Sequence, residues 1–235
     1  MSAHALAMHP VSVTPDDRFQ AALWSQRAAG GAADWTAELR PGGAVLRFAP
    51  DQEIYAEGDE AEKFYKVVSG VVRTCKFLSD GRRQIDAFYR AGDVFGIEAS
   101  EDYGLTAEAV CDVSVVSYRR SHLDTLAAAN PNLSRHLLAY AMSSVAKAQE
   151  HSLLLGRRNA IEKVVAFLVD WAAQSTDGAM ATLAMTRQDM ADYLGLTIET
   201  VSRTLSHLER EAIIELPSAR QIRLRDPDAM AMMSC

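Results

Sequence analysis

The sequence predicts an α+β protein with an N-terminal β-roll, a long helix and a C-terminal winged helix-turn-helix. Three observations support this fold class. Residues 41–119 contain short β-branched and aromatic runs separated by glycine-containing turns. From Pro131 to about Leu155 the chain has no glycine and no further proline. Residues 186–210 read as two short helices around a glycine, and two alternating segments follow them.

The composition is that of a globular chain of one large domain or two ordinary ones. Of 235 residues, 49% are apolar and 23% are charged, so a sizeable core can form. The net charge of −7 argues against a non-specific binder of polyanions. It does not exclude a sequence-reading protein, because a local patch can be basic on an acidic chain.

Cysteine usage and the N-terminus exclude several classes. Cys75, Cys111 and Cys235 form no CxxC or Cys/His spacing, which argues against a disulfide framework, a zinc site or a cysteine-held cluster. We expect Cys75 and Cys111 to be buried and Cys235 to be exposed. The first residues lack a signal sequence, and no apolar run is long enough to span a membrane. We therefore expect a soluble cytoplasmic protein without a cofactor.

The first two segments are an arm, residues 1–40, and a roll, residues 41–130. The arm contains one helical piece, RFQAALWSQRAA. The many short strands at regular spacing predict a sandwich or barrel-like roll. The expected strands are AVLRFAP, QEIYAEGD, FYKVVSG, VVRTCKFL, RQIDAFY and VSVVSY. The segment SHLDTLAAAN then reads as a short helix that ends before Pro131.

The long helix, residues 131–156, carries a seam typical of self-pairing helices. Apolar or small residues recur at alternating steps of four and three, which predicts a dimer interface. These residues are Leu137, Ala141, Ser144, Ala148, His151 and Leu155. A second seam through Leu138, Met142 and Val145 fits nearly as well, and packing of the helix on its own domain is the alternative to pairing.

The last segment, residues 157–235, begins with an amphipathic helix and continues with the two short helices. Thr186 with Asp189 forms a capping pair for the first of these, and Thr197 caps the second. Between them, Gly195 can adopt the positive φ that a sharp turn requires. Ala191 is small where the helices must approach each other. This combination predicts a helix-turn-helix, with a generic helical hairpin as the alternative.

A β-hairpin follows the second helix. Residues 213–216 and 221–224 alternate as strands around a Pro-Ser-Ala-Arg turn. Arg220, Arg223 and Arg225 place cations beside the preceding helix. The hairpin is expected to be a wing next to nucleic acid, and a solvated edge hairpin is the alternative.

Glu199 and Arg203 lie four residues apart near the start of the second helix. At this spacing the two side chains often form a solvated ion pair. The same position in a helix-turn-helix meets base edges in the major groove, where an Arg fork matches guanine and a carboxylate accepts from amino groups. We expect the second role, with Ile198 available for a thymine methyl group.

From about Val45 to Asp228 the chain resembles the CRP/FNR superfamily of bacterial transcription regulators. IYAEGDEAEKFYKVVSGVVR and RAGDVFG resemble its N-terminal roll, and ETVSR resembles the E-x-x-S-R signature of its FNR-type branch. The similarity to FixK-like regulators of low-oxygen and nitrogen-fixation genes rests on GRRNAIEKVVAFL and DYLGLTIETVSRTL.

This resemblance implies a homodimer that binds TTGA…TCAA-type palindromes in double-stranded DNA and activates transcription by recruiting RNA polymerase. By position, the residues that match the family's base contacts are Ile198, Glu199, Ser202 and Arg203. Those that match its phosphate contacts are Arg187, Gln188, Thr197 and Thr200. The tip SDGRRQ is a candidate for polymerase contact.

Two departures from the family's pattern bear on sensing. Oxygen-sensing members carry a mostly N-terminal cysteine cluster, and residues 1–40 contain no cysteine. Members that bind cyclic nucleotides carry an Arg before Thr-Ala, and Leu105 stands there before Thr106 and Ala107. A cyclic phosphate would lose its charged partner. We therefore expect activity without a bound effector.

Two other classes of function are alternatives. One is a regulator gated by a small molecule bound in the roll. If that molecule is haem, the candidate axial ligands are His122, His136 and His151, although each of these residues also fits a surface or a seam. An enzyme would need a phosphate loop, a nucleophile elbow, a zinc motif or a nucleophile–base pair. The sequence contains no convincing example of these, so we expect a protein that is not an enzyme.

Overall fold

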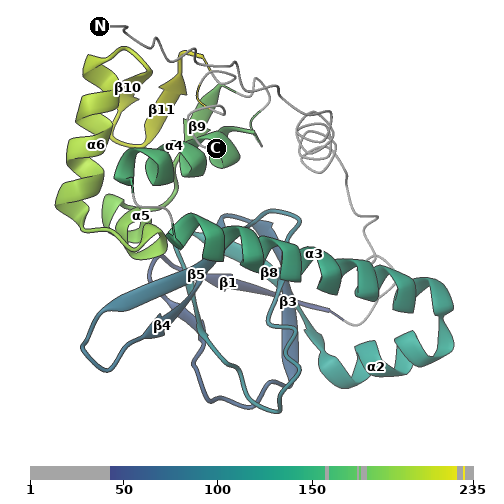
Figure 1. Cartoon of the computed structure of the whole chain (residues 1–235). Helices are drawn as coiled ribbons and strands as arrows, with labels where there is room; N and C mark the ends of the chain where they lie inside the picture. The colour runs from purple at the N-terminus through teal and green to yellow at the C-terminus, as the bar shows by residue number, and fades with distance from the viewer. Residues whose placement is uncertain (1–42, 157–158, 174, 176–178, 227–229, 231–235) are drawn as a thin grey trace, which may run out of the picture. The chain divides into compact units, whose positions relative to one another are not determined.

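The computed structural model describes residues 43–156, 159–173, 175, 179–226 and 230. The expected arm, residues 1–40, and Cys235 lie outside these residues. The elements keep the order roll, long helix and winged helix-turn-helix (Figure 1).

The roll consists of two four-stranded antiparallel sheets. The first has the order β1 (Ala44–Phe48), β8 (Val113–Arg119), β3 (Lys63–Ser69) and β6 (Val94–Phe95). The second has the order β2 (Glu53–Tyr55), β7 (Thr106–Ala109), β4 (Val71–Phe77) and β5 (Arg83–Arg90). The six expected strands are confirmed. Strands β6 and β7 were not expected, because β6 is very short and β7, TAEA, contains residues with low strand propensity.

Aromatic rings fill the interior of the roll. Alternation along β3 turns Tyr65 and Val67 inward and Phe64 outward. Tyr55 stacks on Tyr103 with 3.7 Å between the ring centroids. Phe95 packs against the rings of both Tyr55 and Tyr65. The inner faces of the two sheets are therefore joined by a packed aromatic core.

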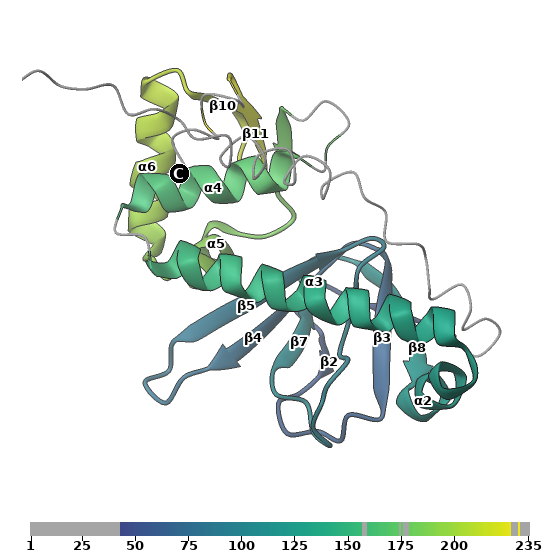
Figure 2. The same ribbon diagram turned by 45° about the vertical axis from the view of Figure 1, so that its right-hand side comes forward.

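Two helices cover the outer side of β3 and β8. Helix α2 (Arg120–Ala129) leads into α3 (Pro131–Gly156), and both pack on an apolar cluster with the outward side chains of the sheet (Figures 1 and 2). The cluster consists of Phe64, Val94, Tyr118, Leu123 and Leu133. The hydroxyl of Tyr140 on α3 donates to the carbonyl of Val94 at 2.9 Å. These contacts fix the first half of α3 on the roll.

The C-terminal domain combines three helices with a three-stranded sheet. The helices are α4 (Ala160–Ala172), α5 (Arg187–Leu194) and α6 (Ile198–Arg210). The antiparallel sheet has the order β10 (Ile214–Ser218), β11 (Gln221–Leu224) and β9 (Met180–Thr182). The expected hairpin is confirmed, whereas β9, only three residues long, was not expected. Across the described part of the chain, no helix has both the length and the apolar character needed to cross a membrane.

Gly70 joins β3 to β4 and has no space for a side chain. Its φ is +87°, and an added Cβ would overlap the carbonyl oxygen of Asp112. Gly81 in the β4–β5 turn has a similar φ, +84°, but an added Cβ would meet no atom within 4 Å. A side chain at Gly81 would meet backbone strain alone, whereas one at Gly70 would meet the same strain and a steric clash.

We expect Gly81→Ala to lower the free energy of unfolding by about 1–3 kcal/mol, the usual cost of a strained backbone conformation. Gly70→Ala should lower it by clearly more, because the β3–β4 turn must also move. Urea denaturation of both variants measures the difference. Equal losses would show that the turn accommodates the methyl group without cost.

Candidate nucleic-acid interface

The first helix of the helix-turn-helix begins with the expected capping box. The side chain of Thr186 accepts from the backbone N–H of Asp189, and Asp189 Oδ2 accepts from the backbone N–H of Thr186. Helix α5 ends at Gly195, whose φ of 61° and ψ of 41° are left-handed. Both expectations are confirmed, and together they set where α5 starts and where the chain turns.

The second helix, α6, divides into a core face and an exposed face. Thr197 caps it as expected, accepting from the backbone N–H of Thr200. Its core face contains Val201, Thr204, Leu205 and Leu208. Ile198, Glu199 and Arg203 are exposed near its start, and Ser202 is half-buried. The predicted base contacts therefore occupy the first turns of a helix that the rest of the domain supports.

Glu199 and Arg203 do not form an ion pair with each other in the described structure. The pKa of the Glu199 carboxyl lies below its ordinary value, chiefly because it accepts from its own backbone N–H and from Thr197, and the charge of Arg203 contributes least. Both side chains are exposed, and neither forms an ion pair with a described residue.

The predicted phosphate contacts lie around the starts of the two helices. Arg187 is half-buried in the first turn of α5, and Gln188 beside it donates to Asp192 Oδ1 at 2.7 Å. Thr197 and Thr200 are joined through their hydroxyls at 3.1 Å. Free backbone N–H groups and cations at helix starts suit anionic groups.

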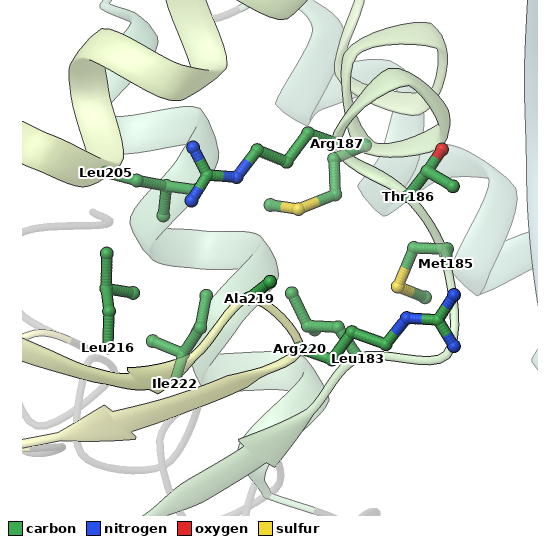
Figure 3. Close-up of a pocket in the computed structure, with 10 residues that line it drawn as sticks. Leu183, Met185, Thr186, Arg187, Leu205, Leu216, Ala219, Arg220 and Ile222 are labelled. Atoms are coloured by element: carbon green, nitrogen blue, oxygen red, sulfur yellow. The ribbon is translucent and has the colours of Figure 1, made fainter.

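A hollow of about 220 Å³ separates the wing from the two helices. Figure 3 shows Arg187 from α5 and Arg220 from the wing turn among the side chains that line it. Neither guanidinium pairs with a carboxylate of the described residues. Arg225, by contrast, donates to Glu215, and Arg223 lies 3.9 Å from the same carboxylate. Arg220 is therefore the wing cation best placed to meet a phosphate.

One side of helix α3 packs against the rest of the chain and the other is exposed. The residues of the two predicted seams differ in which side they occupy. Of the first seam, Leu137 packs against the cluster on β3, His151 stacks on Tyr193 with 4.1 Å between ring centroids, and Leu155 lies near Gly195. Ala141, Ser144 and Ala148 are exposed. An apolar stripe on the outer side is also exposed: Leu138 (63%), Met142 (63%), Val145 (52%) and Leu153 (72%).

An ionic cluster that the sequence did not predict lies between the roll and α5. Its cations are on β4 and β5, and two of its carboxylates are on α5. The members are Arg73, Arg83, Asp51, Glu108, Asp189 and Asp192. No motif marks these residues, because they come together only through the fold.

Cys75 lies beside this cluster and is fully buried, as expected. Its Sγ is 4.0 Å from Glu108 Oε2, and burial raises the pKa of its thiol to about 11. A thiol with a raised pKa is a poor nucleophile. Cys111 is half-buried rather than buried.

Within the described ranges, no three His, Cys, Asp or Glu side chains are grouped so as to hold a metal ion. His151, one of the candidate haem ligands, has its Nε2 2.9 Å from the carbonyl oxygen of Tyr193. This nitrogen is engaged with the end of α5.

Two domain families match the chain. Residues 45–130 match the cyclic nucleotide-binding domain, and residues 162–233 match the Crp-like helix-turn-helix domain.

Relatives match over most of the chain. The nitrogen fixation regulation protein FixK of Azorhizobium caulinodans is 49% identical over 218 residues, 88% of this chain and 87% of the relative. The transcriptional activator protein FnrL of Cereibacter sphaeroides is 31% identical, covering 74% of each chain. The structure of FixK2 from Bradyrhizobium japonicum superposes with a TM-score of 0.79 at 42% identity, covering 82% of this chain and 98% of that one. These relatives regulate transcription and are not enzymes. The chain belongs to the CRP/FNR family of transcription regulators, among the relatives of FixK, and carries the DNA-binding helix-turn-helix of that family.

Proposed function

We propose that the chain is a transcription activator that binds TTGA…TCAA-type palindromes as a homodimer and recruits RNA polymerase without a bound effector. The genes that it controls are those of nitrogen fixation, a proposal that rests on the FixK relatives, or those of low-oxygen metabolism, a proposal that rests on the resemblance of its sequence to FixK-like regulators. The observation that carries the proposal is the exposed start of α6, where Glu199 and Arg203 form no ion pair with a described residue and stand on a buried scaffold. Helices α5 and α6 (residues 187–210) form the reading head.

The chemistry of this surface suits base recognition. An Arg fork donates two hydrogen bonds to guanine O6 and N7, and a carboxylate accepts from an exocyclic amino group of cytosine or adenine. Ile198, 38% exposed, supplies an apolar contact for a thymine methyl group. These side chains supply complementary contacts for the bases of a TTGA half-site.

Four side chains near this surface suit phosphate contacts, which position the head without reading sequence. They are Arg187, Gln188, Thr197 and Thr200, from the starts of the two helices. Arg220 adds a cation on the wing. A free guanidinium gains more from a phosphate than one already paired to a carboxylate, as in Arg225.

The residues of the roll do not fit a cyclic nucleotide. Leu105 supplies no charge for the cyclic phosphate, and the hydroxyl of Thr106 accepts from the backbone N–H of Glu57 at 3.0 Å. The stacked rings of Tyr55 and Tyr103 occupy the core nearby. A roll whose interior is packed by its own side chains supports the proposal of activity without a nucleotide.

Pairing of two α3 helices is supported by the apolar stripe on the outer side of α3. Three exposed residues of this stripe, Leu138, Met142 and Val145, recur at steps of four and three, the spacing of a coiled-coil seam. Isolated exposed apolar residues are ordinary, but a continuous stripe marks an interaction surface. Because Leu137 and His151 contact their own chain, we place the centre of the interface on the stripe, with Ala141 and Ala148 beside it.

The β4–β5 turn is the proposed polymerase contact. It exposes Phe77 and Leu78 next to the polar tip at residues 79–84. An apolar pair beside a polar tip suits a protein partner.

Removing one reader should change sequence preference while leaving the fold intact. Arg203→Ala should remove roughly 1–3 kcal/mol of discrimination per half-site, because the guanine contact is lost. Glu199→Ala should relax preference at a different base pair, since the carboxylate also rejects bases that present acceptors. Competition binding with palindromes altered at one symmetric pair at a time measures both effects. Uniform weakening on every sequence would leave these residues without a reading role.

Removing a phosphate contact should weaken binding equally on all sequences. Arg187→Ala should reduce the slope of log K against log salt by about one unit per subunit. Arg225→Ala is the matched control, because its cation is already paired with Glu215 and should change the slope little. A variant of Arg187 that loses preference at one base pair would assign Arg187 to a base instead.

Charge on the outer stripe should separate the subunits. Met142→Glu should weaken the dimer because two like charges would be buried across the seam. DNA affinity should fall with it, since two half-sites need two linked heads. Sedimentation velocity compares this variant with Ser143→Glu, exposed but on neither seam, and with Ala141→Glu on the first seam. A dimer that survives Met142→Glu but not Ala141→Glu would move the interface to the first seam.

A further inference from the structure

Two arginines of the roll bind carboxylates on the first helix of the reading head. Arg83, at the start of β5, donates from Nε to Asp192 Oδ2 at 2.9 Å and from Nη2 to Asp189 Oδ1. Arg73, in β4, donates from Nη1 to the same oxygen of Asp189 at 3.2 Å. A planar guanidinium bonds two carboxylates at once only in a narrow range of orientations. These contacts therefore constrain the direction of α5.

The cluster is enclosed by the protein except at Asp51, whose side chain is 77% exposed. The side chains of Arg73 and Asp189 are 6% and 3% exposed, and those of Arg83 and Asp192 are 18% and 12% exposed. A buried ion pair adds little net stability, because the loss of hydration offsets the attraction. It does penalise arrangements that leave one charge unpaired. Such a cluster is better suited to selecting one orientation than to holding the fold together.

The same carboxylates lead directly to the predicted DNA surface. The second oxygen of Asp189 accepts from Thr186 at the cap of α5. Asp192 Oδ1 accepts from Gln188, a predicted phosphate contact, at 2.7 Å. One carboxylate thus separates Arg83 from a group that would meet DNA. The exposed start of α6 takes no part in the cluster.

We infer that Arg83, assisted by Arg73, is a positioning residue of the DNA-binding site. It fixes the angle of the reading head on the roll and, in the dimer, the separation of the two heads. The inference rests on the proposed function and adds to it a property of the roll, which sets the spacing between half-sites. Neither arginine touches a base.

The test measures spacing preference in the full-length protein. The probes are TTGA…TCAA duplexes with the spacer at its best length, one base pair shorter and one base pair longer. We expect the wild type to favour one spacer by roughly ten- to hundredfold, because rigid heads reach both half-sites at one separation only. Arg83→Gln should bind the three duplexes with affinities within about threefold of one another, because reading heads that are no longer fixed on the roll can adapt to each spacer. Arg83→Lys, which keeps the charge but not the fork, should fall between.

Two controls separate positioning from general destabilisation. Lys76→Gln, whose ammonium on β4 pairs with Glu57 of the roll at 2.7 Å, should keep the wild-type preference. Discrimination against a single altered base pair in TTGA should be the same in Arg83→Gln and wild type, because the head itself is unchanged. A merely weakened fold would lower affinity for all duplexes and leave the spacing preference in place.

Asp192→Asn tests the same contact from the helix side and decides the question if Arg83→Gln does not fold. It should show the same loss of spacing preference. Wild-type spacing preference in a folded Arg83→Gln or Asp192→Asn protein would overturn the inference. A wild-type protein that binds none of the duplexes would instead overturn the proposed function.

Discussion

The carboxylate of Asp189 is the group on which the connection between the roll and the reading head depends. It is almost completely buried, and it accepts from the cap of α5 on one oxygen and from Arg73 and Arg83 on the other. A buried carboxylate without such partners would cost several kcal/mol. Strands β4 and β5 and the first turn of α5 must therefore be in place together. Phe88 and Arg90 extend this contact along β5, packing against Trp171 of α4.

The interior of the roll is also held in place by close packing. Rings of Tyr55, Tyr65, Phe95 and Tyr103 form a continuous core between the two sheets. In the proposed account, the roll keeps this one packed arrangement and needs no small ligand to select it. The head is then held by contacts of the chain itself, through the ionic cluster and through His151 at the end of α5.

Local signals predicted the elements of the fold well. These signals are capping residues, the left-handed glycine and β-branched runs, and each one determines the conformation of the few residues around it. The sequence therefore predicts α5, α6, six strands of the roll and the hairpin of the wing. Strands β6, β7 and β9 were not predicted, because short segments form strands only when partners distant in sequence present an edge to them. The position of the predicted base contacts at the start of α6 could be predicted for the same local reason. The cluster around Asp189 could not, since Arg73 and Asp189 are 116 residues apart. Periodicity also left two seams open on α3, because it cannot show which side of a helix packs against its own chain.

Equilibrium titration of a labelled TTGA…TCAA palindrome with the purified full-length protein tests the central claim most directly. The titration is made with no small molecule added and again with cyclic AMP, and the absorbance spectrum of the same sample reports any bound haem. The account predicts specific binding by the colourless protein alone, with a Kd that cyclic AMP does not change. Binding that appears only after a nucleotide or haem is supplied would contradict it.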